Sequence, residues 1–231
     1  MRVEPRVVGS IAHIVKRGTR GMNIVRDERD RLRFSSSILL LNDSFADPNW
    51  SDALREPGRP DHWPEQDPLV HILAWTLMPN HFHLLLEEIR KGGIAKFMQR
   101  LCGSMSAAFN AKYSETGSMF QGAYKSKTVA DDTYLRYLTF YIQVKNVLEL
   151  FPGGLKQATR DFDQAWEWAL SYPFSSLPAY AGGVASPIVE SKRLLELYPE
   201  RMDFKKEARE MLITHLEHHD DTLSSLMLEP W

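Results

Sequence analysis

Residues 70–87 read VHILAWTLMPNHFHLLLE, and this stretch decides the fold. Its first eight residues are almost all apolar, as expected of a strand that is buried in a sheet. Met78, Pro79 and Asn80 then favour a tight turn, because proline fixes its own backbone torsion and asparagine tolerates a positive one. Residues 81–87 return as a second strand, so the stretch predicts a β-hairpin in the middle of the chain.

The segments around the hairpin alternate between extended and helical patterns. Residues 11–15 alternate in polarity and lead into a basic, glycine-punctuated loop, and Asp27 is placed to cap a charged amphipathic helix. Further helices are expected at about 94–114 and 131–150, with an extended crossing at 124–129. Strands separated by helices predict an α+β fold, a ferredoxin-like (RRM-like) antiparallel sheet with helices on one face.

The chain is expected to form one main domain with an appendage. Its 231 residues are enough to bury a full hydrophobic core. The expected domain covers residues 1–182 and contains an irregular insert at about 42–68 that is rich in Asp, Pro, Asn and Trp. Residues 183–231 are expected to form an acidic, helical C-terminal extension.

Composition and charge narrow the function classes. A hydrophobic fraction of 43% with 25% charged residues is typical of a soluble globular protein, and no apolar run approaches the ~20 residues of a membrane span. The first residues lack the apolar core of a signal peptide, so a cytoplasmic protein without a membrane partner is expected. Cys102 is the single cysteine, which excludes an intrachain disulfide.

The net charge of −2 hides a gradient along the chain. Residues 90–145 hold nine basic residues against three acidic ones, and residues 196–231 hold nine acidic residues against four basic ones. A locally basic segment attracts phosphates even when the whole chain is slightly acidic. The middle of the chain is therefore the part suited to binding nucleic acid.

His81 and His83 are the strongest candidates for chemistry. Residues two apart in a strand point to the same face, so both imidazoles project together. Two such nitrogens can hold a divalent metal when a third group comes from elsewhere. The plainer interpretation is a pair of histidines on a solvent-facing strand, and the two residues by themselves do not exclude it.

Further motifs in a fixed order favour the metal site. After MPNHFH at residues 78–83 come FQGAYKS at 120–126, YLRYLTFYI at 134–142 and YPFSS at 172–176. Together these segments resemble the HUH-type single-tyrosine transposases, above all the REP-associated tyrosine transposases and the related insertion-sequence, transposase-like proteins of bacteria. The resemblance spans about residues 8–182.

The resemblance implies a DNA nickase and strand transferase that acts on single-stranded DNA, near hairpins. The two histidines and one polar group would hold Mg²⁺ or Mn²⁺, which polarises the scissile phosphate. A tyrosine would attack that phosphate, leaving a covalent 5′-phosphotyrosine and a free 3′-OH. A phenol has a pKa of about 10, so it needs a metal or a nearby cation to become a good nucleophile. Because such transposases act alone or as pairs, the resemblance leaves a homodimer open.

The family pattern places the nucleophile at Tyr141. Tyr134, Tyr137 and Tyr141 are spaced i, i+3, i+7 and share one helical face. Packing of an aromatic stripe is the competing interpretation for Tyr134 and Tyr137.

The third metal ligand is where the chain departs from the pattern. The family usually has Asn or Gln four residues after the nucleophile, whereas this chain has Lys145 followed by Asn146. A protonated lysine has no lone pair to offer a metal. Gln143 is a weaker substitute, because it points roughly to the opposite side of the helix.

Three interpretations of this departure stay open. A local helix irregularity could bring Asn146 round as the ligand. Lys145 could instead pair with the phenolate or the phosphate, with water filling the metal shell. The third interpretation is a domesticated, catalytically impaired protein that binds DNA hairpins without cutting them.

Five basic residues are the predicted DNA contacts: Arg17, Arg20, Lys125, Lys127 and Lys145. Two lie in the first loop, two alternate on the extended segment beside the site, and one follows the tyrosine, where they could contact the DNA backbone and bases. Ordinary surface charge is the alternative interpretation. His13, on the first strand, is interpreted as a core or edge histidine rather than a ligand.

Overall fold

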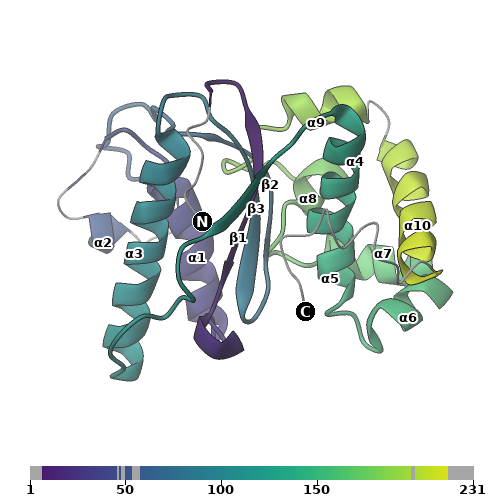
Figure 1. Cartoon of the computed structure of the whole chain (residues 1–231), viewed down its shortest axis with the longest axis horizontal. Helices are drawn as coiled ribbons and strands as arrows, with labels where there is room; N and C mark the ends of the chain where they lie inside the picture. Colours follow the sequence, from purple (N-terminus) through teal and green to yellow (C-terminus); the bar gives the residue numbers. More distant parts are fainter. Residues whose placement is uncertain (1–6, 46, 48–49, 54–57, 199–200, 218–231) are drawn as a thin grey trace.

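The protein is built around a four-stranded sheet with helices on both sides (Figure 1). The computed structural model describes residues 7–45, 47, 50–53, 58–198 and 201–217. All neighbouring strands are antiparallel, in the order β2-β3-β1-β4. The strands are β1 (Ile11–Arg17), β2 (His71–Leu77), β3 (His81–Glu87) and β4 (Lys125–Thr128). β2 and β3 are the two arms of the predicted hairpin, which is confirmed.

Two long helices cover one face of the sheet. They are α1 (Glu28–Leu40), which starts from a capping box at Asp27, and α3 (Gly93–Tyr113). A capping box satisfies backbone N–H groups that the first helical turn leaves without partners. Alternate residues of β3 point to this face, where Phe82 packs 5.1 Å from the ring of Phe34. This half of the molecule is the ferredoxin-like arrangement that the sequence predicts.

The opposite face of the sheet carries the predicted tyrosine helix. The helix starts as α4 (Asp132–Phe140), continues as η2 (Tyr141–Lys145) and ends in α5 (Asn146–Leu148). Leu73 and Leu85 contribute to the core between the sheet and this helix. The α+β fold is thus confirmed, and the second face is closed by the tyrosine helix and the helices that follow it in the chain.

The remaining helices pack around the tyrosine helix. They are α6 (Gly154–Arg160), α7 (Phe162–Leu170), α8 (Leu177–Tyr180), α9 (Lys192–Leu197) and α10 (Arg201–Glu217). Leu194 of α9 and Leu212 of α10 belong to the same core as Tyr141. The part of the predicted extension at 218–231 lies outside the described residues. None of the described helices is long and apolar enough to cross a membrane.

Two segments with little regular structure are held in place by specific contacts. The predicted insert at 42–68 contains the short α2 (Trp50–Ala53), and buried Asp43 anchors it through an ion pair with Arg59 at 2.8 Å. The YPFSS motif pairs with the outer edge of β2, where the Leu77 N–H donates to the Phe174 carbonyl and the Ser176 N–H to the Trp75 carbonyl. This motif therefore covers backbone groups that an edge strand would otherwise expose.

Candidate active site

His81 and His83 lie on the face of β3 that looks toward the tyrosine helix. Both are buried, with 6% and 0% of their surfaces exposed. Their ring centroids are 4.9 Å apart and the rings are nearly perpendicular, at 78°. The structure therefore brings the two histidines together on one face, as the H-x-H spacing predicts, but inside the protein rather than at a solvent-facing strand.

The ring nitrogens of His81 are distinguished by a hydrogen bond from its own turn. Its Nδ1 lies 2.6 Å from the side-chain oxygen of Asn80. A carboxamide oxygen can only accept, so Nδ1 carries the proton and Nε2 carries the lone pair. A histidine that binds a metal usually donates its other ring N–H to an oxygen in this way, which fixes its tautomer and ring orientation.

The surroundings keep both histidines neutral. Burial, with smaller effects from the positive charges of Arg17 and Lys145, lowers the pKa of His81 to about 4. Burial also holds the pKa of His83 well below its ordinary value, with smaller effects from His81, His13 and Lys145. A neutral imidazole is the form that can bind a metal.

His13 reaches the same site from β1. Its Nε2 lies 2.9 Å from Nδ1 of His83, and the two rings stack at 5.2 Å with an interplanar angle of 17°. In the register of the sheet His13 is opposite Leu85, so it is the diagonal neighbour of His83. Burial lowers the pKa of His13 to about 3, with a smaller effect from Lys127. The core position expected for His13 is observed, but the residue also contacts a predicted metal ligand.

Tyr141 lies at the start of a π-helical turn. The Asn146 N–H donates to the Tyr141 carbonyl, five residues back, instead of the four of an α-helix. The ring of Tyr141 is 5.5 Å from that of His83 and meets it edge to face at 76°. A π turn is a single extra residue in an α-helix, frequently found at functional sites. The irregularity offered as one interpretation of the sequence is therefore present, and it begins at the predicted nucleophile.

The extra residue changes which side chains share a face with Tyr141. In an α-helix the residue four positions on lies one turn above, but in a π turn the residue five positions on takes that place. Asn146 is thereby moved toward the face of Tyr141. Its side chain is 1% exposed, and its Nδ2 has no hydrogen-bond partner among the described residues.

Lys145 lies directly against the predicted nucleophile. Its Nζ is 4.7 Å from the centroid of the Tyr141 ring and 2.6 Å from a carboxylate oxygen of Glu149, and the residue is 4% exposed. The same charge lowers the pKa of both His81 and His83. A single cation therefore influences the tyrosine and both histidines.

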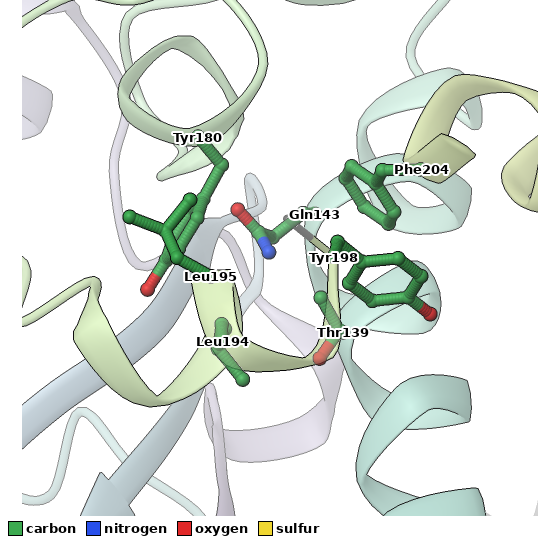
Figure 2. Close-up of a pocket in the computed structure, with 7 residues that line it drawn as sticks. All are labelled: Thr139, Gln143, Tyr180, Leu194, Leu195, Tyr198 and Phe204. Atoms are coloured by element: carbon green, nitrogen blue, oxygen red, sulfur yellow. The ribbon is translucent and has the colours of Figure 1, made fainter. Parts of the chain in front are cut away.

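Gln143 points into a different part of the molecule. It lines a cavity of about 10 Å³ between the tyrosine helix, α8, α9 and α10 (Figure 2). There its side-chain oxygen accepts a hydrogen bond from Ser176 at 3.0 Å. The cavity is lined by Thr139, Gln143, Tyr180, Leu194, Leu195, Tyr198 and Phe204. The structure thus places Gln143 in the packing of the C-terminal helices.

The π turn is fixed to the sheet by Thr76. Its hydroxyl donates to the carbonyl of Ile142, and in the register of the hairpin Thr76 is the direct partner of His83. The strand that carries this threonine is in turn held by the YPFSS segment. A chain of contacts therefore connects the motif at 172–176 to the turn that carries Tyr141.

The donor set fits a divalent cation. His81 and His83 supply two neutral imidazoles on adjacent positions of one face, and imidazole nitrogens are common ligands of divalent transition-metal ions. Among the described residues no cluster of three His, Cys, Asp or Glu side chains occurs that could hold a metal. A third protein ligand would have to be of another residue type, such as the amide oxygen of Asn146.

The predicted DNA contacts surround this face of the sheet. In the register, Arg17 is the partner of His81, Lys125 of Val15 and Lys127 of His13, so all three side chains start from the face of the histidines. Lys127 extends over the ring of Tyr134 at 5.2 Å. Arg20 is exposed in the short turn η1 (Thr19–Gly21), with a positive φ of 52°. The structure brings Lys145 to the ring of Tyr141 and leaves Arg20 at the end of the sheet.

Four contacts of the site were not predicted: those of His13, Thr76, Asn80 and Glu149. Asn80 is part of the recognised motif, but its hydrogen bond requires the side-chain geometry of the turn. The spacing of Lys145 and Glu149, four residues apart in a predicted helix, was the one signal that could have indicated their ion pair.

Acid should destabilise the fold through these histidines. In the folded protein the pKa values of His13 and His81 are about 3 and about 4, below the ~6.5 of an unfolded chain. The unfolded state then binds more protons below about pH 6.5, so the free energy of unfolding falls as the pH drops from 6.5 toward 4. Each histidine contributes a slope of up to about 1.4 kcal/mol per pH unit.

Urea unfolding of the wild type and of His13→Gln at pH 7, 6 and 5 measures this slope. The variant should show the shallower decline, whereas His71→Gln, at a partly exposed position, should match the wild type. Equal slopes for wild type and His13→Gln would mean that His13 does not cause the acid sensitivity.

Comparisons with known proteins identify the segment that carries this site. Residues 65–145 match the family described as "Transposase IS200 like", and none of the curated proteins compared with the chain matches it. A solved REP-associated tyrosine transposase bound to a REP hairpin is 15% identical, with a TM-score of 0.49, over 81% of this chain and 88% of that one.

A further solved structure, described as a transposase from Deinococcus radiodurans R1, is 15% identical with a TM-score of 0.27, over 61% of this chain and 95% of that one. The matched family segment contains His81, His83 and Tyr141. The segment that holds the candidate site, residues 65–145, is therefore similar to the IS200-like transposases.

Proposed function

We propose that the chain cleaves and rejoins single-stranded DNA, beside hairpins, through a covalent 5′-phosphotyrosine at Tyr141. The similarity of residues 65–145 to the IS200-like transposases supports a role in DNA processing. The observation that carries the finer proposal is the contact between the Tyr141 ring and His83, at 5.5 Å on one face of the sheet. Because both residues come from one chain, the proposed site is complete within a single copy.

The reaction is an exchange of one phosphodiester bond for another. Oη of Tyr141 attacks the scissile phosphorus, the bond from phosphorus to the 3′ oxygen breaks, and that oxygen takes up a proton. The phenolic proton passes to solvent, and the 5′ phosphate stays on the tyrosine. Attack by a 3′-OH on the phosphotyrosine reverses the step, so strands are rejoined without a nucleotide cofactor.

His81, His83 and Asn146 would hold the divalent cation, Mg²⁺ or Mn²⁺. When bound, this ion supplies Lewis-acid polarisation of the scissile phosphate. The role of His81 and His83 is supported by their neutral, hydrogen-bonded rings. The role of Asn146 is supported by the π turn, which gives this residue the place that residue i+4 has in a regular helix.

Asn146→Ala should lower the affinity for Mn²⁺ at least tenfold, because it removes the amide oxygen proposed as third ligand. Lys145→Ala should leave that affinity within about threefold. It should instead weaken binding of single-stranded DNA and reduce the slope of log affinity against log salt by about 0.7, the effect of one lost phosphate contact. Titration with Mn²⁺, followed by electron paramagnetic resonance, and DNA binding at several salt concentrations measure the two effects. The assignment of Asn146 fails if its alanine variant binds Mn²⁺ like the wild type.

Substrate entry requires a rearrangement at Lys145. Tyr141 and His83 are 2% and 0% exposed in the DNA-free chain. Lys145 covers one side of the tyrosine ring and is paired with the carboxylate of Glu149. An arriving phosphate would replace that carboxylate as the anionic partner, with Arg17, Arg20, Lys125 and Lys127 contacting the rest of the strand.

The second candidate function is hairpin binding without cleavage. Two observations favour it: Lys145 occupies the position where the family usually has a ligand, and the nucleophile is buried. This candidate keeps the basic residues as DNA contacts and gives no role to Tyr141. The two functions therefore differ in the products that DNA yields.

A cleavage assay tests the proposed function. The probe is a library of 5′-labelled, single-stranded oligonucleotides, each with a hairpin flanked by randomised sequence, incubated with the protein and Mg²⁺ or Mn²⁺. The proposal expects shorter labelled strands whose 3′-OH can be extended by a polymerase. Library members that bind tightly but remain intact with both ions would favour the second candidate.

A further inference from the structure

The two stacked histidines His13 and His83 share a single hydrogen bond deep in the protein. The bond joins Nε2 of His13 to Nδ1 of His83 at 2.9 Å, and both residues are at most 1% exposed. Both rings are buried, and burial favours the neutral imidazole, which carries one proton. A hydrogen bond between two nitrogens needs one proton between them, so the tautomers of the two rings depend on each other.

Only two arrangements of the protons satisfy this bond. In the first, His13 donates from Nε2, and His83 then also carries its proton on Nε2. In the second, His83 donates from Nδ1 to His13, and both rings are protonated on Nδ1. Nε2 of His83 has a lone pair only in the second arrangement. His13 thus determines whether His83 can be a metal ligand through that nitrogen.

The position of His13 on the sheet suits this task. β1 and β3 are paired over their whole lengths, and His13 is fixed diagonally to His83 by that register. Its ring stacks on His83 and meets Tyr141 edge to face at 6.2 Å. The His83 ring is thereby held between His13 and the tyrosine helix, while Asn80 orients His81 by an equivalent bond. Each proposed histidine ligand has one partner at Nδ1.

We propose that His13 is a positioning residue for the metal site: its Nε2 accepts the Nδ1–H of His83 and so presents the Nε2 lone pair of His83 to the cation. The inference rests on the proposed function, because it assigns His83 as a ligand. Nδ1 of His13 is buried and has no hydrogen-bond partner among the described residues. In the arrangement that leaves the lone pair on Nε2 of His83, this nitrogen of His13 carries the proton, and a cation on His83 would stabilise that arrangement.

Substitutions of His13 test whether the residue acts as a hydrogen-bond acceptor or only fills space beside His83. Glutamine can place its side-chain oxygen near the position of Nε2, asparagine is too short to do so, and leucine fills the volume without an acceptor. We expect His13→Gln to bind Mg²⁺ and Mn²⁺ within about fivefold of the wild type. His13→Asn and His13→Leu should bind these ions roughly 10–100-fold more weakly, as is typical when the residue that orients a metal-binding histidine is lost.

Nitrogen NMR of the imidazole rings in the Mg²⁺-saturated protein reports the tautomer of His83, which a change in packing alone would not alter. His83 should be protonated on Nδ1 in the wild type and in His13→Gln, and this signal should be lost in His13→Leu. Thermal melting without metal identifies any variant that does not fold. Among the folded variants, a higher metal affinity for His13→Gln than for His13→Asn would support the role of His13 as an acceptor, and equal affinities would contradict it.

The outcomes separate this inference from the proposed function. If the wild type binds Mg²⁺ or Mn²⁺ but His13→Leu binds equally well, only the role of His13 is wrong. If the wild type binds neither ion, the role of His13 and the metal site are both overturned.

Discussion

Replacing Tyr141 by phenylalanine is expected to abolish the covalent protein–DNA adduct and leave hairpin binding within about twofold of the wild type. Phenylalanine keeps the ring that packs against His83 and under Lys145 and removes only Oη, the proposed attacking atom. Because the reaction forms a bond to that oxygen, the loss should be complete. Denaturing gel electrophoresis of protein incubated with 3′-labelled single-stranded DNA measures it.

Tyr137→Phe is the matched control. Tyr137 belongs to the same aromatic stripe, with its ring 6.0 Å from that of Tyr141, and its hydroxyl is also buried. Burial raises the pKa of Tyr137, so its hydroxyl stays protonated at neutral pH. This control should form the adduct like the wild type. An adduct that persists in Tyr141→Phe and disappears in Tyr137→Phe would assign the nucleophile to Tyr137.

The double variant His81→Ala/His83→Ala should lose measurable binding of Mg²⁺ and Mn²⁺ and slow adduct formation at least about 1000-fold. The expected factor follows from the several kcal/mol by which a bound cation stabilises the charge of the transition state, at 1.36 kcal/mol for each factor of ten. Both histidines are buried on one face and neutral, so their removal takes away both imidazole donors together. Isothermal titration with each ion and single-turnover kinetics measure the two losses.

His71→Ala controls for the removal of a histidine as such. His71 is at the other end of the hairpin, where its Nδ1 pairs with Glu87 at 2.9 Å. Metal binding and adduct formation should remain as in the wild type. If the double variant cleaves at the wild-type rate, these histidines do not support catalysis and the metal must be held elsewhere.

The hairpin and the shared face of its histidines could be predicted from the sequence because both follow from strictly local rules. Proline and asparagine define the turn, and the two-residue period of a strand fixes which side chains point the same way. The pairing of β1 with β3 then places Arg17 opposite His81, which only the register reveals. The local pattern thus predicted that His81 and His83 share a face, and the pairing of β1 with β3 determined which residues lie beside them.

The π turn and the partner of His83 could not be derived in the same way. One inserted residue leaves the helical pattern almost unchanged, so the sequence could offer the irregularity only as one of three interpretations. The hydrogen bond from Asn146 to the Tyr141 carbonyl and the contact of Thr76 with Ile142 are what distinguish the turn. His13 is far from His83 in sequence, and its contact depends on a diagonal relation across two strands.

The sequence pattern also could not predict that the site is buried. A strand with two histidines at alternating positions is typical of a solvent-facing surface, yet here the tyrosine helix covers that face. The cover consists of the same helix that carries the proposed nucleophile, Tyr141. Access of DNA is therefore linked to the contacts of Lys145 and Glu149 at the C-terminal end of the π turn.

Mass spectrometry of the protein–DNA adduct tests the central claim most directly. Wild-type protein is incubated with Mg²⁺ or Mn²⁺ and the hairpin library, with label at the 3′ end, and the adduct is digested with nuclease and trypsin. If Tyr141 is the nucleophile, a nucleotide will be joined through its 5′ phosphate to the peptide that contains Tyr141. No such peptide is expected in the presence of a chelator. Tight hairpin binding without any adduct, or an adduct on another residue, would contradict it.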